Sequence, residues 1–185
     1  MDINRRALLG TARLSLRPLR QEDAPHVIAG IGQLRVSRYL SVVPHPYGPE
    51  DFAHYLGIAR PGFHWAIEDA DGHVGGISLD PGLGFWIAPD RQGRGYVTEA
   101  ARAVLAAHFA DPEAGPVSSG YFTDNAASAA VHRRLGFVTT SVEDKLCRAL
   151  GVSRPLLRQL LTREDWAGQG ATAPYGLHSR HGVTE

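Results

Sequence analysis

The stretch LGFWIAPDRQGRGYV, residues 83–97, combines an apolar strand pattern, a glycine-containing loop and the start of a helix. Gly93 and Gly95 lie two residues apart, which lets the backbone turn tightly and point its amides inward. The first turn of a helix leaves four backbone N–H groups without intrahelical acceptors, and the helix dipole is positive there. This combination favours a phosphate or pyrophosphate site, to which Arg91 and Arg94 add positive charge. The same glycines also fit a loop with a purely geometrical role, because so short a motif is weak evidence alone.

Two common nucleotide-binding motifs are excluded by inspection of this loop. A P-loop requires Gly-Lys-Ser or Gly-Lys-Thr, but the only lysine of the chain is Lys145. A dinucleotide fingerprint requires glycine or alanine at position 98, where this chain has Thr98. The loop is therefore neither a P-loop nor a dinucleotide fingerprint.

Periodicity in the first half of the chain predicts antiparallel strands and short helices. We expect an edge strand near residues 14–16 and a hairpin formed by residues 64–79 with a turn at its centre. Helices are expected to begin after Asp23, which we interpret as an N-cap, and at Pro49.

The second half alternates helices with strands. Apolar residues at helical spacing predict a long helix that starts near Val97 and has Glu99 on its solvent side. A shorter helix is expected between its cap Asn125 and Gly136, which ends it with a left-handed turn. Strands are expected at residues 117–123 and 156–162, and another strand is expected to begin at residues 138–142. Together with the first half, this order predicts an α+β fold.

Composition places the chain among soluble single-domain proteins. It has 185 residues, of which 43% are hydrophobic and 21% charged, as in ordinary globular domains. Lys+Arg and Asp+Glu both number 19, so no overall field favours nucleic acid or an anionic membrane. The single cysteine, Cys147, excludes an intramolecular disulfide, and no apolar run reaches the ~20 residues of a membrane span. We expect a cytoplasmic protein without nucleic-acid or membrane partners and without a metal, as a monomer or homodimer.

A second group of residues lies about 30 positions after the glycine loop. It reads Asn125-x-x-Ser128-x-x-Val131-x-x-x-Leu135-Gly136-Phe137. Together with residues 92–97, QGRGYV, it resembles the acetyl-CoA signatures of the GNAT superfamily of N-acetyltransferases. In that family the loop pattern is Gln/Arg-x-x-Gly-x-Gly/Ala, so Gln92 and Gly95 match while Val97 stands where glycine or alanine is usual. A valine there either crowds the pyrophosphate or points into the core with the helix's apolar residues.

The resemblance is strongest to the subgroup that acetylates the N-terminal serine or alanine of ribosomal proteins. The strand GFWI, residues 84–87, and the loop and helix start GRGYVTEA, residues 93–100, are similar to that subgroup. So are the opening segment at residues 11–17 and the closing segment at residues 161–166. The resemblance thus covers a domain of residues 11–166 and leaves residues 167–185 as a C-terminal tail.

For the fold, the resemblance implies a mixed sheet of six to seven strands with about four helices. Its fourth and fifth strands are parallel and splay apart, so that the pantetheine arm of acetyl-CoA satisfies their unpaired backbone groups. Asn125 and Ser128 are expected on one wall of this gap, although capping or surface roles fit them equally well. The other expected cofactor-binding residues are Trp86, Ile87, Ala88, Arg91, Gln92, Gly93, Arg94, Gly95, Tyr96 and Val97.

Acetyl transfer requires a deprotonated amine, a polarised thioester oxygen and a proton for the departing thiolate. By resemblance, the acid position is His132, whose ordinary pKa of about 6.5 permits an imidazolium. The amide of Ile87 or Ala88 is expected to polarise the oxygen. Direct transfer needs no covalent intermediate, so Cys147 is not expected to be a nucleophile.

The base and the acceptor site are less specific in the sequence. Asp80, at the end of a strand, is our candidate base, with Glu68, His64 and water as alternatives. The acceptor is expected to contact a loop that contains Tyr39, His45 and Tyr47. Three functions remain open on these grounds: acetylation of a primary amine such as a protein N-terminus, acetylation of a small-molecule amine, and non-catalytic binding of an acyl-CoA.

Overall fold

The computed structural model describes residues 7–168. Its helices and strands follow one another as β1 (Leu9–Gly10), β2 (Ser15–Arg17), α2 (Ala24–Ile31), α3 (Leu34–Ser37), α4 (Pro49–Ile58), β3 (His64–Asp69), β4 (Gly72–Leu79), β5 (Leu83–Ile87), α5 (Tyr96–Phe109), β6 (Val117–Phe122), α6 (Ala126–Leu135), β7 (Val138–Cys147), β8 (Val152–Leu161) and α7 (Arg163–Gly168).

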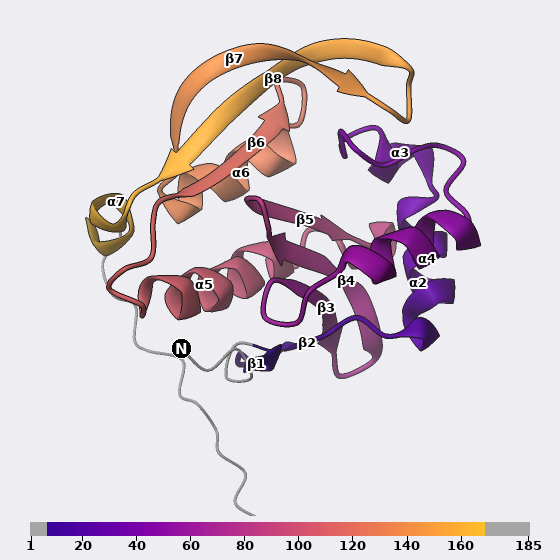
Figure 1. Cartoon of the computed structure of the whole chain (residues 1–185), viewed down its shortest axis with the longest axis horizontal. Coiled ribbons are helices and arrows are strands. Elements are labelled where there is room, and N and C mark those ends of the chain that lie inside the picture. Colours follow the sequence, from indigo (N-terminus) through magenta and orange to yellow (C-terminus); the bar gives the residue numbers. More distant parts are fainter. Residues whose placement is uncertain (1–6, 169–185) are drawn as a thin grey trace, which may run out of the picture.

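All the strands belong to one mixed sheet in the order β1-β2-β3-β4-β5-β6-β8-β7 (Figure 1). Neighbouring strands are antiparallel except β5 and β6, which are parallel. The α+β class expected from the sequence is confirmed. The expected numbers were too low, because the described part of the chain contains eight strands and six α-helices.

The sheet is covered by helices on both faces, with a separate apolar cluster on each. Side chains of α5 such as Ala101 and Val104 pack with Trp65 and Ile67 of β3 into the main core. Val27 and Ile31 of α2 form the second cluster with Phe52 of α4. Alternate residues of a strand point to opposite faces, so one strand contributes to both clusters.

The parallel pair at the centre of the sheet is joined at a single register position, Leu83 with Ser119. There the hydroxyl of Ser119 donates a hydrogen bond of 2.7 Å to the carbonyl of Leu83. Beyond this point β5 and β6 continue without pairing. The splay was expected between the fourth and fifth strands, and the additional first strand β1 makes them the fifth and sixth. The sheet therefore consists of two halves, β1–β5 and β6-β8-β7, with a gap between them.

Several local expectations were wrong. Residues 15–17 form an inner strand, because β1 pairs with their outer side. Asp23 precedes α2 but does not cap it, since its carboxylate accepts hydrogen bonds from Arg17 and the Arg20 amide. Strand β7 does begin at Val138, as expected, and extends to Cys147.

The end of the domain also differs from the expectation. Helix α7 was not expected, and it includes Ala167 and Gly168, the first two residues of the expected tail. The rest of that tail lies outside the described residues.

Candidate active site

A cleft of about 1150 Å³ opens between the two halves of the sheet. It runs from the glycine loop before α5, along the gap between β5 and β6, to α3, α4 and the β7–β8 hairpin. Figure 1 shows that hairpin arching over β6 toward α3. Most of the residues expected for the cofactor and two of the three expected for the acceptor therefore line one continuous space.

The glycine loop has the geometry that the sequence predicts. Gly93 and Gly95 have φ of 77° and 78°, in the left-handed region that side chains disfavour, and Gly95 is the N-cap of α5. No side chain caps this helix, and the first intrahelical bond runs from the Glu99 amide to the Gly95 carbonyl. The amides of the first turn thus lie at the cleft with the positive end of a 14-residue helix.

The side chain of Glu99 supports the glycine loop from inside the domain. The sequence analysis missed this role, because it placed Glu99 on the solvent side of the helix. It is only 9% exposed, and its carboxylate accepts hydrogen bonds from the Thr11 hydroxyl at 2.6 Å and from Arg13 Nε at 2.7 Å. Arg13 also donates to the carbonyl of Arg94 at 3.1 Å and so ties the loop to the N-terminal segment. Burial raises the pKa of Glu99, but the bonds from Thr11 and Arg13 outweigh it and hold the pKa below its ordinary value.

The polar side chains of the loop have different partners. Arg91 is held by the carboxylates of Asp69 and Asp71, at 3.1 and 3.0 Å, so its charge is already neutralised. Arg94 is exposed and bonds only weakly to the carbonyl of Asp90, at 3.4 Å, which leaves its charge for an anion at the rim. The amide of Gln92 donates to the carbonyl of Ile87 at 3.0 Å, and this bond fixes the loop against the end of β5.

Two further loop residues face the core as well as the cleft. The hydroxyl of Tyr96 donates to Asp69 at 2.9 Å and its ring is buried, so its backbone is the part nearest an anion. Val97 is half-buried, packs against the main core and also lines the cleft.

The backbone of β5 selects between the two amides that we expected to polarise the thioester oxygen. The Ala88 amide donates to the carbonyl of Val74 at 2.9 Å and does not line the cleft. In an antiparallel pair, backbone groups of successive residues point alternately toward and away from the partner strand. The Ile87 amide therefore points away from β4, toward the gap, and Ile87 lines the cleft.

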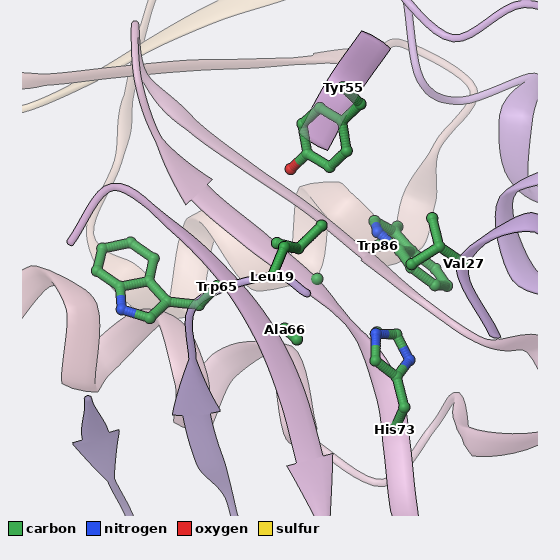
Figure 2. Close-up of a pocket in the computed structure, with 9 residues that line it drawn as sticks. Leu19, Val27, Tyr55, Trp65, Ala66, His73 and Trp86 are labelled. Atoms are coloured by element: carbon green, nitrogen blue, oxygen red, sulfur yellow. The ribbon is translucent and has the colours of Figure 1, made fainter. Parts of the chain in front are cut away.

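Trp86 lines the cleft, and it packs against the apolar cluster of α2 and α4. Figure 2 shows the indole next to Val27 of α2, with His73 beside it at a ring-centroid distance of 5.8 Å. The narrow pocket in this view has no room for a water molecule. The indole lies against Gly30 of α2 and Gly76 of β4, whose missing side chains provide its space. Trp86 is thus mainly a packing residue of β5.

On the opposite wall, Asn125 and Ser128 both line the cleft. The Asn125 side chain also caps α6 by accepting a hydrogen bond from the Ser128 amide at 3.0 Å, so both roles considered for it coexist. Gly136 ends the helix with φ of 81°, as expected.

The structure does not bring His132 into the cleft. Its side chain is 1% exposed, and its two ring nitrogens bond to the Ser119 hydroxyl at 2.7 Å and to the Ser128 carbonyl at 2.8 Å. Burial lowers its pKa below the ordinary value, against a smaller raising effect of the Ser128 bond. The ring holds in place two serines that line the cleft.

The candidate base and its alternatives are distributed unevenly. Asp80 lines the cleft and forms an ion pair of 2.7 Å with Arg60. Glu68 instead pairs with Arg17 outside the cleft lining, and His64 is buried, with Nδ1 accepting from the Arg60 amide.

Of the three expected acceptor residues, Tyr39 and Tyr47 line the cleft, whereas His45 is exposed and does not. Tyr55 of α4 was not expected at the acceptor site, yet it lines the cleft too. Burial raises the pKa of Tyr47 and of Tyr55 to about 12, so both hydroxyls stay protonated.

Cys147 lies at the far end of the cleft region but is fully buried, and its thiol donates to the carbonyl of Arg38. Within residues 7–168, no group of three or more His, Cys, Asp or Glu side chains is arranged to hold a metal ion. None of the helices in that range has the length and hydropathy needed to cross a membrane.

Comparisons with known proteins agree with this geometry. Residues 13–138 match the sequence model of the family described as "Acetyltransferase (GNAT) domain". The fold is similar to RimJ from Mycobacterium smegmatis, solved in complex with CoA-disulfide (22% identity, TM-score 0.70, 85% of this chain and 88% of that one).

Two structures of ribosomal-protein acetyltransferases are similar as well. One, from Salmonella typhimurium, modifies the N-terminal serine of ribosomal protein L7/L12 (16% identity, TM-score 0.68, 82% of this chain and 96% of that one). The other is the ribosomal-protein-S5-alanine acetyltransferase from Vibrio fischeri (18% identity, TM-score 0.69, 86% of this chain and 98% of that one).

A mixed sheet that opens between two parallel strands, beside a glycine loop at a helix start, defines an acyltransferase fold. Since the family model covers well over half of the chain, the protein belongs to the GNAT acetyltransferase family.

Proposed function

We propose that this protein is an acetyl-CoA-dependent N-acetyltransferase that moves the acetyl group directly to the α-amine of a protein N-terminus. The observation that carries the proposal is the continuous cleft from the glycine loop, through the gap between β5 and β6, to the surface between α4 and the β7–β8 hairpin. A long, thin thioester donor enters such a cleft from one end and an amine from the other.

The donor end fits acetyl-CoA in three respects. The first-turn amides of α5 and the exposed Arg94 suit a pyrophosphate. The unpaired edges of β5 and β6 suit the amides of a pantetheine arm, as an added strand would. Asn125 and Ser128 form the opposite wall. The packing of Val97 against the core supports a cofactor site that this larger side chain leaves open.

Bound acetyl-CoA would supply an activated acetyl thioester. The Ile87 amide, pointing into the gap, would donate a hydrogen bond to the carbonyl oxygen as negative charge develops on it. The acceptor amine forms the new C–N bond while the C–S bond breaks, so a proton leaves the amine and one reaches the thiolate. We retain Asp80 as the proposed proton acceptor, because it lines the cleft. We assign His132 a positioning role through Ser119 and Ser128, instead of the acid role that the resemblance implied.

The position of the acceptor end of the cleft, between α4 and the β7–β8 hairpin, favours a peptide as the acceptor. Tyr39, Tyr47 and Tyr55 line it, and residues of α4 and the hairpin flank it. The similar structures that act on ribosomal-protein N-termini share this fold, which favours the same class of acceptor.

Release of free thiol from acetyl-CoA, with mass analysis of the acceptor, tests this function. Each peptide should be used in two forms, with a free and with a blocked N-terminus, and each should contain one internal lysine. We expect thiol release and one added acetyl group only with the free form. Turnover of polyamines or amino sugars without turnover of any peptide would overturn the N-terminal assignment, and acetylation of the blocked peptide would indicate a lysine acceptor.

Binding of the donor is checked separately by melting. Acetyl-CoA at about 1 mM should raise the melting temperature, because a ligand that binds only the folded state stabilises it by mass action. NAD at the same concentration is the control, and a shift with NAD but not with acetyl-CoA would contradict the proposal.

A further inference from the structure

The acceptor end of the cleft has one wall that is unusually basic. It is formed by the β7–β8 hairpin, and we define the hairpin wall as Glu143, Lys145, Arg148, Arg154 and Arg158. Lys145, Arg148 and Arg158 line the cleft. The wall is fixed to the α3 end of the domain, because the Arg148 amide donates to the carbonyl of Ser41 at 3.1 Å.

Two carboxylates near this wall already form ion pairs with arginines of the chain. Glu143 pairs with Arg158 at 2.7 Å. Asp124, after β6, forms ion pairs with both Arg154 and Arg38. Asp144 points to the other face of the hairpin, because side chains alternate along a strand.

Lys145 is the only lysine in the chain, and it forms an ion pair with none of these carboxylates. Within residues 7–168 no Asp or Glu lies at ion-pair distance from its ammonium group, although the side chain is half-buried and faces the cleft. Its cross-strand neighbour is another cation, Arg154. Like charges at directly opposite positions of a sheet destabilise it. Asp124 neutralises Arg154, whereas the charge of Lys145 has no neutralising carboxylate among residues 7–168.

The first turn of α4, which also lines the cleft, has negative charge. Glu50 and Asp51, in this turn, line the cleft, and neither forms an ion pair among the described residues. The Asp51 carboxylate accepts a hydrogen bond from the Gly48 amide, and Glu50 is exposed. An amine that arrives as an ammonium ion is attracted to this side, while the hairpin wall attracts a negative group on the same molecule.

We propose that the acceptor is a peptide with an acidic side chain within its first four residues, and that Lys145 binds this carboxylate. The inference rests on the proposed function, since it assigns the substrate of the same site. Arg148 is a secondary contact, because its guanidinium also donates to the carbonyl of Val42 at 3.1 Å. Lys145 acts on specificity and takes no part in the proton transfers.

Matched peptides test the proposal. Peptides that begin with serine or alanine should carry glutamate at position two, three or four, and each should have a glutamine counterpart that differs only in charge. We expect kcat/KM to be about tenfold higher for glutamate in at least one position. The preference should shrink when the salt concentration rises from 0.05 to 0.5 M, because ions screen a partly exposed pair.

Two variants assign the preference to one residue. Lys145→Met keeps most of the aliphatic chain, removes the charge and should reduce the preference to less than about twofold. Lys145→Glu should invert it, in favour of peptides with lysine at that position. Arg133→Ala is the matched control, because this arginine is exposed on α6 and does not line the cleft. It should leave the preference unchanged.

The outcomes separate this inference from the proposed function. Equal rates for glutamate and glutamine peptides, or an unchanged preference in Lys145→Met, overturn the inference while N-terminal acetylation stands. A raised KM for acetyl-CoA in Lys145→Met, with the peptide preference intact, assigns the lysine to the donor and also overturns it. If no peptide reacts but free glutamate is acetylated in a Lys145-dependent manner, carboxylate recognition by Lys145 is supported and the N-terminal assignment fails.

Discussion

Replacing Gly30 of α2 with alanine tests how Trp86 of β5 packs against α2. Gly30 lies inside a helix, where alanine is normally favoured over glycine by about 0.5–1 kcal/mol. Here, however, the new Cβ would lie 2.4 Å from the Trp86 ring, far inside van der Waals contact. The indole cannot simply move across the sheet, because a Cβ on Gly76 would already lie 2.7 Å from its Nε1. Overpacking of this kind costs about 1–3 kcal/mol.

The two effects have opposite signs, and the clash should prevail. We expect Gly30→Ala to lower the free energy of unfolding by about 1–2 kcal/mol, a fall of roughly 2–8 °C in melting temperature for a domain of this size. The KM for acetyl-CoA should rise as well, because displacement of Trp86 moves β5. Urea titration, thermal melts and steady-state kinetics measure these effects.

Gly57→Ala in α4 is the matched control. Nothing lies within 4 Å of a Cβ at that position, so this change should stabilise the protein by about 0.5–1 kcal/mol. Adding Trp86→Phe to Gly30→Ala should relieve the clash and recover part of the loss. If Gly30→Ala stabilises the protein as Gly57→Ala does, the indole does not occupy the space between α2 and β4, and the reasoning is refuted.

Four other substitutions probe the donor end of the cleft and its support. Glu99→Gln should cost about 1–3 kcal/mol and raise the KM for acetyl-CoA, because a charge-assisted support of the loop is lost; unchanged melts and kinetics would contradict this. Val97→Ala should cost about 1 kcal/mol while CoA affinity stays within about threefold, whereas a tenfold gain in affinity with an unchanged melt would show that the valine obstructs the site. Gly95→Val should raise the KM for acetyl-CoA at least about tenfold, compared with Gly151→Val, which has the same backbone strain outside the cleft; equal effects on the KM would exclude a phosphate role for the loop. The free energy of unfolding should fall as the pH drops below 6.5, because the pKa of His132 is lowered in the folded state and the unfolded chain takes up the proton first. His132→Gln should reduce the dependence of this free energy on pH by up to about 1.4 kcal/mol per pH unit. The same pH dependence in urea titrations of the variant and the original protein would contradict a role for His132.

The geometry of the glycine loop and of the α6 cap could be predicted from the sequence because it is local. A glycine conformation, a helix start and a cap depend on residues within one turn of each other, so the loop around Gly95 and the cap at Asn125 were both predicted correctly. The splay of β5 and β6 was available only through the family resemblance, since no local pattern states which strands fail to pair.

The missed features depend on residues far apart in the chain. Glu99 has a charged side chain at a position where local patterns predict exposure, and only its contact with Arg13, 86 residues away, reveals its burial. His132 fits a solvated helix surface next to two arginines, but the bond to Ser119 on a neighbouring strand places it inside. Tertiary partners decide both cases.

The single register position between β5 and β6 has a consequence for how the protein unfolds. Among residues 7–168, Leu83 and Ser119 are the only backbone pairing across the middle of the sheet, so the two half-sheets are linked there mainly by helices and side chains. Both halves share the main core, but the interrupted backbone ladder leaves them to open locally with different free energies, which we expect hydrogen exchange to detect. A donor bound between β5 and β6 would form hydrogen bonds with the backbone groups that the two strands leave unpaired. It would thereby couple the opening of one half-sheet to that of the other. Hydrogen exchange in the weaker half would then report occupancy of the cleft from amides that never touch the ligand.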